Sequence, residues 1–383
     1  MAGGVGPTRH GALSFLCSYF DVSKVRPLSM GNKTIPALTG LRGVAALWVV
    51  LFHLMIGGRS IVTNGYLGVD IFFILSGFVL AHVYADRFRS RGAAVYGSFL
   101  KARVARIYPL HLVVLGALVL IVLTVPDFAS QYPEPDRRFG AGCLAASAVL
   151  LQNWFYWLPM CWNGPSWSLS AEWFAYLLFP IFMLATQYWR RPATALCLAG
   201  LCLCGLVLAL RMKGVSSTNV QGTPGLVRMS LQFACGCLIF RALRTGLKPL
   251  PFLAEIGVLA MFAAALILQN TLLLLISFAA IILLAAQNEG LLAKALSTRI
   301  AVLLGEISYS IYLVHWMVLQ FLNRMTAKVA DDPVHIIIFG VSEVALILAL
   351  SACTYRLIEV PARAWGRKIG TPTAAVLANA DAI

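Results

Sequence analysis

The chain has 383 residues, of which 60% are hydrophobic and only 12% are charged. Soluble domains usually have about a quarter of their residues charged, and one soluble core could not bury this much apolar surface. The composition therefore excludes an ordinary soluble protein. The net charge is +15, but the basic residues lie mostly between apolar segments, where they are typical of cytoplasmic loops rather than of a nucleic-acid-binding surface.

Apolar runs of about 20 residues, the length that crosses a bilayer, follow one another along the chain. They predict an all-α polytopic membrane protein with about ten transmembrane helices. In chain order these lie near residues 37–56, 65–86, 107–126, 168–188, 193–211, 225–244, 251–269, 271–287, 301–323 and 335–358. Residues 34–368 are expected to form one membrane domain, with 1–33 and 369–383 as N- and C-terminal tails.

Residues 140–158 are apolar enough to span, but they lead into an aromatic run with Pro and Gly at 153–167. Basic residues decide its placement, because cytoplasmic loops are enriched in Lys and Arg. If this segment does not cross, one side of the membrane collects 21 Lys and Arg residues and the other side 7. We therefore predict cytoplasmic termini and a re-entrant or interfacial segment at 140–165 on the outer side. The expected location is the cell (inner) membrane.

The nine cysteines show no metal-ligand spacing, so no metal is expected. Most of them lie inside apolar runs, where cysteine behaves as a small hydrophobe. Cys143 and Cys161 could meet on the exported face, but we do not predict a disulfide between them.

Two ionisable residues share the first predicted span. Arg42 and His53 are eleven residues apart, which places them on one helix face and about 16 Å apart along its axis. The predicted orientation puts Arg42 near the cytoplasm and His53 near the outer side. Such a pair suits a conduit through the bundle. The alternative is that Arg42 extends to the interface and His53 is an ordinary core histidine.

Three further ionisable residues, Asp70, Glu172 and His315, are predicted at the same outward depth as His53. A carboxylate that orients an imidazole lets histidine act as a general base. The four residues are therefore candidate catalytic residues. The alternative is that the two carboxylates only cap the N-termini of their helices.

Arg103 and Arg106 stand three residues apart at the start of the third predicted span, with Lys101 beside them. Residues at this spacing share a helix face, and arginine binds phosphate with two parallel hydrogen bonds. The three residues could form a phosphate clamp, although basic residues are also common at a cytoplasmic boundary.

Six motifs in order connect these residues. They are Arg42-x10-His53, Gly68-Val-Asp-x-Phe-Phe-x-Leu-Ser-Gly-Phe78, Arg103-x-x-Arg-Ile-x-Pro109, Trp167-Ser-Leu-x-x-Glu172, Arg228-x4-Phe-x-x-Gly236 and Ile307-Ser-Tyr-Ser-Ile-Tyr-Leu-x-His315. Across residues 34–368 the chain resembles the acyltransferase-3 family of membrane O-acyltransferases. The sequence Ile358-Glu-Val-Pro361 departs from the Glu-Arg-Pro that is usual there.

The resemblance implies transfer of an acyl group, usually acetyl, from cytoplasmic acyl-CoA to a hydroxyl of a cell-surface carbohydrate. It implies that the donor acetyl-CoA is bound by Arg42, Arg103 and Arg106 with Lys101, and that His53 works at the transfer point with Asp70, Glu172 and His315. Candidate substrate-binding residues are Trp167, Ser168, Arg228 and Tyr309. Some relatives carry an extra esterase-like domain; we expect this chain to deliver to its acceptor without one.

Two alternatives stay open at this point. Some members of the resembled family acylate a small lipophilic molecule such as a macrolide instead of a carbohydrate. A transporter without acyl chemistry would share the polytopic layout, but transporters often show two related halves, and none are visible in the sequence. The length of the acyl chain and the oligomeric state are not predicted.

Overall fold

The computed structural model describes residues 34–54, 61–92, 94–326 and 333–370. Every helix described below belongs to the unit Ile35–Ile383. The described residues form helices and connecting loops, with no strand among them. The predicted tail at 1–33 and residues 371–383 of the predicted C-terminal tail lie outside the described residues.

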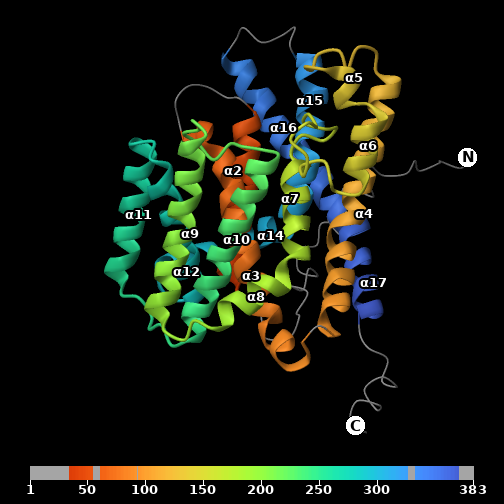
Figure 1. Ribbon diagram of the computed structural model, residues 1–383. Coiled ribbons are helices and arrows are strands. Elements are labelled where there is room, and N and C mark those ends of the chain that lie inside the picture. Colours follow the sequence, from red (N-terminus) through yellow and green to blue (C-terminus); the bar gives the residue numbers. More distant parts are fainter. Residues whose placement is uncertain (1–33, 55–60, 93, 327–332, 371–383) are drawn as a thin grey trace, which may run out of the picture. The chain divides into compact units, whose positions relative to one another are not determined.

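The helices cross the bundle back and forth (Figure 1). The first half contains α2 (Pro36–His53), the 3-10 helix η2 (Ile61–Leu67), α3 (Gly68–Arg91), α4 (Ala94–Thr124), α5 (Pro135–Arg138), α6 (Ala141–Ala148), α7 (Ser166–Leu177), α8 (Phe179–Gln187) and α9 (Pro192–Met212). The second half contains α10 (Thr223–Arg244), α11 (Phe252–Ile267), α12 (Thr271–Gln287), α13 (Gly290–Leu296), α14 (Arg299–Glu306), α15 (Ser308–Thr326), α16 (Pro333–Thr354), the π-helix η3 (Tyr355–Glu359) and α17 (Val360–Gly370).

Length and composition allow six continuous helices among the described residues to cross a membrane, or nine spans if each of three bent pairs counts as one. The bent pairs are α7 with α8 (56°), α12 with α13 (84°) and α14 with α15 (65°). The prediction of an all-helical multi-pass protein is therefore confirmed. The one predicted span outside these nine, 251–269, corresponds to α11, which has 16 residues. The count of ten and the orientation stay predictions.

One boundary prediction was wrong. The third span was expected to begin near residue 107, but α4 begins at Ala94. Residues 94–106 are mostly good helix formers without an internal proline, so the helix extends through the basic stretch. As a result, Arg103 and Arg106 lie well inside a helix rather than at its start.

The segment expected at the interface lies at one end of the bundle (Figure 1). Helix α6 has 8 residues, too few to cross a bilayer, and an irregular chain leads from it to α7. A disulfide joins Cys143 to Cys161, with a Cα–Cα distance of 5.3 Å. This bond was not predicted, because nothing in the sequence shows that the chain after α6 folds back on that helix.

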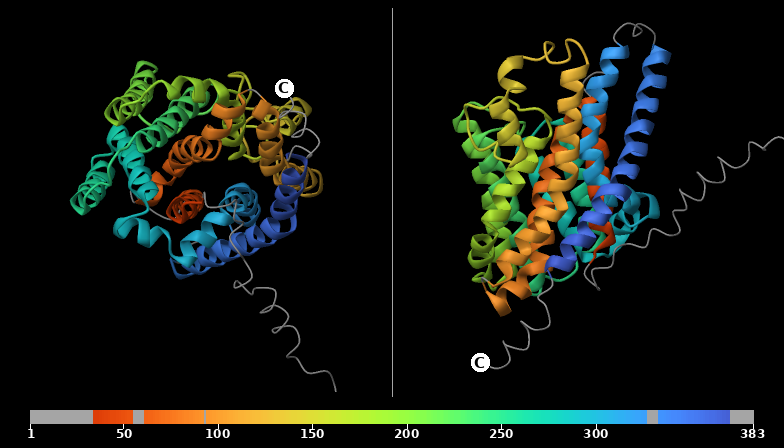
Figure 2. Two further views of the ribbon diagram at one scale, coloured as in Figure 1. Left: turned by 90° about the horizontal axis from the view of Figure 1, so that it is seen from below. Right: turned by 90° about the vertical axis from the view of Figure 1, so that its right-hand side faces the viewer.

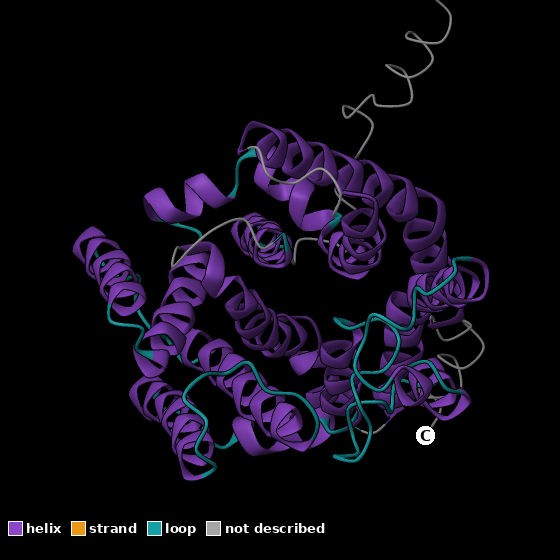
Figure 3. Ribbon diagram, turned by 90° about the horizontal axis from the view of Figure 1, so that it is seen from above, coloured by secondary structure: helices purple, strands orange, loops and turns teal. Residues whose placement is uncertain are grey.

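Viewed along the bundle, α2, α3 and α15 lie toward the middle, with α4, α9, α11 and α17 outside them (Figures 2 and 3). Glycines allow the central helices to approach closely. A Cβ on Gly77 of α3 would run into the carbonyl of Phe233, and a Cβ on Gly236 of α10 would run into the carbonyl of Ile74. Small residues at such crossings are typical of membrane helix pairs. This packing fixes the central helices that carry the ionisable residues.

Candidate active site

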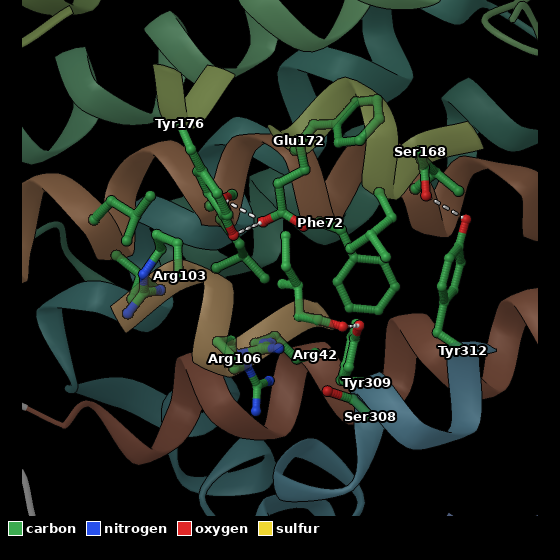
Figure 4. Close-up of a pocket in the computed structure, with 18 residues that line it drawn as sticks. Arg42, Phe72, Arg103, Arg106, Ser168, Glu172, Tyr176, Ser308, Tyr309 and Tyr312 are labelled. Atoms are coloured by element: carbon green, nitrogen blue, oxygen red, sulfur yellow. Dashed lines mark hydrogen bonds between the residues drawn. The ribbon is translucent and has the colours of Figure 1, made fainter. Parts of the chain in front are cut away.

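A cavity of about 110 Å³ lies between the central helices and α4 and α7 (Figure 4). Six of the predicted site residues line it: Arg42, Arg103, Arg106, Ser168, Glu172 and Tyr309. Other lining residues include Phe72, Phe73, Ser76, Tyr176, Ser308 and Tyr312. The structure therefore brings together the predicted donor-binding arginines with one of the predicted carboxylates. Lys101 is exposed on α4 and is absent from this lining.

The arginine cavity has an excess of positive charge. Within the described residues, no ion pair joins Arg42 or Arg103 to a carboxylate. The guanidinium of Arg103 lies 5.7 Å from the ring centre of Tyr84 and 5.9 Å from that of Tyr176, and its Nε is buried without a hydrogen-bond partner. Three arginines and one glutamate line the space, so it attracts anions.

Glu172 is held within this cavity by two hydroxyls. Ser76 Oγ donates to Glu172 Oε1 at 2.7 Å, and the hydroxyl of Tyr176 donates to the same oxygen at 2.5 Å. Ser76 and Tyr176 were not predicted as site residues. Their positions carried a signal, since Ser76 belongs to a quoted motif and Tyr176 is four residues after Glu172, on the same helix face.

Arg106, unlike the other two arginines, has a carboxylate partner. Its Nη1 lies 2.8 Å from Oε2 of Glu359, which also pairs with Arg363 and accepts a hydrogen bond from Ser310 Oγ at 2.5 Å. Glu359 ends the π-helix η3, a feature that is frequent at functional sites. Glu359 was missed as a site residue, although the motif Ile358-Glu-Val-Pro361 contains it.

The two predicted catalytic histidines meet at the other end of α2. Nε2 of His315 lies 3.3 Å from Nδ1 of His53. Nδ1 of His53 is 2.9 Å from the Val49 carbonyl oxygen. Since a carbonyl oxygen only accepts, this nitrogen carries the proton. Nε2 of a neutral His53 therefore has a free lone pair, as a general base requires.

His315 is fully buried and is oriented in the same way, with its Nδ1 3.1 Å from the Ile311 carbonyl oxygen. That carbonyl fixes the proton on Nδ1, so Nε2 of His315 presents a lone pair to the N–H of His53. A carboxylate was expected to accept a hydrogen bond from the ring of His53. The acceptors found beside Nδ1 of His53 are instead Nε2 of His315 and the Val49 carbonyl oxygen.

Tyr312 connects the arginine cavity to the histidine pair. Its ring lines the cavity and lies 5.8 Å from the ring of His315, centre to centre. Its hydroxyl is 2.7 Å from Ser168 Oγ and donates to the Pro165 carbonyl at 3.1 Å. One end of the cavity is thus beside the histidines, although Tyr312 was not selected from the sequence.

Asp70 and Arg228 belong to a separate, closed network. Arg228 is 1% exposed, with its Nε 2.9 Å from Asp70 Oδ1 and its Nη2 2.8 Å from Oδ2. Gln232 and Thr218 also donate to this carboxylate, at 2.5 and 2.9 Å. Asp70 or Glu172 was expected to orient His53, but three hydrogen-bond donors and the ion pair with Arg228 occupy the oxygens of Asp70, so Asp70 does not do so. Arg228, paired and buried, is likewise not open to a substrate.

Trp167, predicted to bind substrate, lies on the other side of this network. Its ring is 5.4 Å from the Arg228 guanidinium and 6.0 Å from the ring of Phe73. Trp167 is absent from the arginine cavity, while its neighbour Ser168 lines it. The start of α7 therefore forms a wall of the arginine cavity: Ser168 faces the cavity, and Trp167 faces the network of Asp70 and Arg228.

The region next to the histidines contains a buried cation. The guanidinium of Arg138 lies 4.5 Å from the ring centre of Tyr132 and 5.4 Å from that of Trp316, the residue after His315. Burial raises the pKa of the Tyr132 phenol to about 12. At neutral pH the phenol is therefore protonated and donates to Gln320 Oε1 at 2.9 Å.

Across the part of the chain that the structure describes, no three His, Cys, Asp or Glu side chains are grouped to hold a metal ion.

Comparison with known proteins gave a family and several relatives. The sequence model of the Acyl_transf_3 family, described as an acyltransferase domain, matches residues 35–354. The chain is 29% identical over 332 residues to acyltransferase MdmB of Streptomyces mycarofaciens, covering 76% of this chain and 80% of that protein. It is 27% identical over 367 residues to O-acetyltransferase OatA of Staphylococcus aureus, covering 87% of this chain but only 58% of that protein. No solved structure matches the chain.

Proposed function

The chain belongs to the Acyl_transf_3 family of acyltransferases, and from this premise we propose that it transfers an acetyl group from cytoplasmic acetyl-CoA to a hydroxyl of a cell-surface carbohydrate. The observation that carries the proposal is the arrangement along α2. An anion-attracting cavity surrounds Arg42, and a histidine with a free nitrogen ends the same helix.

The arginine cavity suits the phosphates of coenzyme A. Arg42 and Arg103 have no carboxylate partner among the described residues, and arginine binds phosphate oxygens in pairs. Lys101, the fourth residue expected to bind the donor, is exposed outside the cavity, and we leave it out of the proposed site. The pantetheine arm would extend past Tyr312 and place the thioester beside His53.

The opposite ends of the bundle support this direction of transfer. The connections α8–α9 and α10–α11 lie at the same end as the start of α4 (Figure 1) and carry Arg190, Arg191 and Lys248, as expected of cytoplasmic loops. The disulfide between Cys143 and Cys161 belongs to the other end, and disulfides persist in oxidising compartments outside the cytoplasm.

In the proposed reaction, Nε2 of His53 removes the proton of the acceptor hydroxyl while that oxygen attacks the thioester carbonyl. A carbon–oxygen bond forms and the carbon–sulfur bond breaks. The protonated His53 then returns the proton to the departing thiolate of coenzyme A. His315 faces the Nδ1–H of His53 at 3.3 Å and would stabilise the positive charge during the reaction.

The test is acyl transfer by detergent-purified protein given radiolabelled acetyl-CoA and a panel of methyl glycosides. We expect labelled sugar ester from the wild type. We expect at least about a 100-fold loss of transfer in His53→Ala, with acetyl-CoA binding retained. His82→Ala, a histidine of α3 outside the site, is the control and should transfer normally. Normal transfer by His53→Ala would contradict the proposed role of His53. Label found only on a lipophilic alcohol would favour the small-molecule alternative.

A further inference from the structure

A second cavity, of about 40 Å³, lies behind the wall formed by the start of α7. It is lined by Gln152, Asn153, Gly164, Trp167, Gln221 and Gly222, among others, and the proposed reaction does not use it. We propose that this amide-lined cavity binds the acceptor by hydrogen bonds to the hydroxyl groups of a sugar. The inference rests on the proposed acyl transfer and adds the location and chemistry of the acceptor site.

Gln152, which lines the amide-lined cavity, has one buried group that lacks a partner. Gln152 is 5% exposed, and its Nε2 donates to the carbonyl and to Oγ of Ser166, both at 3.1 Å. Its Oε1 is buried and accepts no hydrogen bond from any described residue. Leaving a buried acceptor unsatisfied costs about 1–3 kcal/mol, so native structures usually provide a donor from water or a ligand. A sugar hydroxyl is such a donor.

The remaining amides make the cavity polar on several sides. Asn153 is fixed by two hydrogen bonds with Gly222, since the Gly222 N–H donates to Oδ1 at 2.6 Å and Nδ2 donates to the Gly222 carbonyl at 3.3 Å. Gln221 precedes Gly222 and also lines the space. Amides both donate and accept, as sugar hydroxyls do. A lipophilic acceptor would leave Gln152 Oε1 unpaired, which favours the carbohydrate.

Two anchors hold the walls of this cavity in place. Cys161, at one wall, is tied to α6 by the disulfide. The loop that carries Gln221 is tied to α3, because the Thr218 hydroxyl donates to the buried Asp70 at 2.9 Å. A site that is fixed before its ligand arrives loses less entropy on binding. The closed network of Asp70 thereby gains a role in shaping the acceptor site.

The amide-lined cavity also lies near α15, the helix that carries His315. Trp167 lines it, while the next residue, Ser168, lines the arginine cavity. A Cβ on Gly164 would lie 3.2 Å from ring atoms of Trp316, the neighbour of His315. Asn163 Nδ2 donates to the carbonyl of Leu313 at 3.2 Å. An acceptor bound here would thus lie on the histidine side of the protein.

The test measures the acceptor KM with the methyl glycosides and labelled acetyl-CoA used above. Gln152→Met keeps the length of the side chain but removes its amide. Gln221→Ala truncates a residue that is only partly buried, so this variant should fold. It therefore tests the acceptor site even if Gln152→Met fails to fold. Gln269→Ala is the matched control, because Gln269 is exposed and bonds within its own turn. We expect about a tenfold rise in acceptor KM for each cavity variant, with no change in the control or in acetyl-CoA affinity.

The possible outcomes distinguish an error in the acceptor site from an error in the proposed acyl transfer. Acetyl-CoA binding and sugar acylation with unchanged acceptor KM in both cavity variants would overturn the acceptor site but leave the proposed function intact. Transfer to a macrolide alcohol and to no glycoside would overturn the assignment of this cavity to a sugar. Wild-type protein that binds no acetyl-CoA would contradict the proposed function itself.

Discussion

At the scale of single residues, the charged side chains inside the bundle fall into two groups that differ in whether their partners are already present. The Asp70 carboxylate meets Arg228, Gln232 and Thr218 and is closed to other partners. Arg42 and Arg103 face a cavity with no ion pair to a carboxylate among the described residues. A saturated charge stabilises the fold when both partners are present, whereas an unpaired one in a cavity is available to a ligand.

The histidine pair gives a prediction at this scale. Replacing His315 by alanine removes the lone pair that faces the N–H of His53, so His53 should be a poorer base but still present. We expect kcat to fall by about tenfold or more, with KM for acetyl-CoA unchanged. His315→Gln, which can still accept a hydrogen bond, should recover part of the loss. An unchanged kcat in His315→Ala, measured by steady-state transfer, would show that the pair is only structural.

At the scale of elements, the sequence predicted which segments are helical better than where they pair. Apolar length identified the spans, and the basic loops correctly kept 140–165 at one end of the bundle. The start of α4 was missed because its basic turns are not apolar. The partners of Asp70 were missed because they lie about 150 residues away in the chain, and no local pattern encodes that distance. Spacing placed Arg103 and Arg106 on one helix face, and the family resemblance added Arg42 to them; the arginine cavity has all three in its lining.

The crossing of α3 and α10 gives a prediction for an element pair. Gly236→Ala places a methyl group against the Ile74 carbonyl, so the helices must separate. Gly205→Ala on α9 meets nothing within 4 Å, and there alanine should gain about 1 kcal/mol of helix propensity. We expect a lower midpoint of thermal unfolding in detergent for Gly236→Ala, and an equal or higher one for Gly205→Ala. Equal behaviour of the two variants would contradict the close crossing.

At the scale of the whole molecule, the proposed reaction requires two ends in different compartments. The arginine cavity draws on the halves of α2 and α4 nearer the basic connections, while the histidine pair lies beside the segment that holds the disulfide. Donor and acceptor would therefore approach from opposite sides and meet at the end of α2.

Orientation can be tested on intact cells with a membrane-impermeant maleimide. Trp157 is 55% exposed in the segment before α7, and Lys248 lies in the basic connection between α10 and α11. We expect Trp157→Cys to react from outside the cell, and Lys248→Cys to react only after permeabilisation, each compared with the parent protein as background. The reverse pattern would contradict the direction of transfer.

The most direct test of the account is the binding of acetyl-CoA to purified protein by titration calorimetry. The wild type should bind saturably. Arg103→Ala should weaken binding by about tenfold or more, the effect of losing a charge-assisted phosphate contact. Lys101→Ala, two residues away on the same helix but outside the arginine cavity, should bind like the wild type. Equal binding by all three proteins, or none by the wild type, would contradict the assignment of the arginine cavity to the donor.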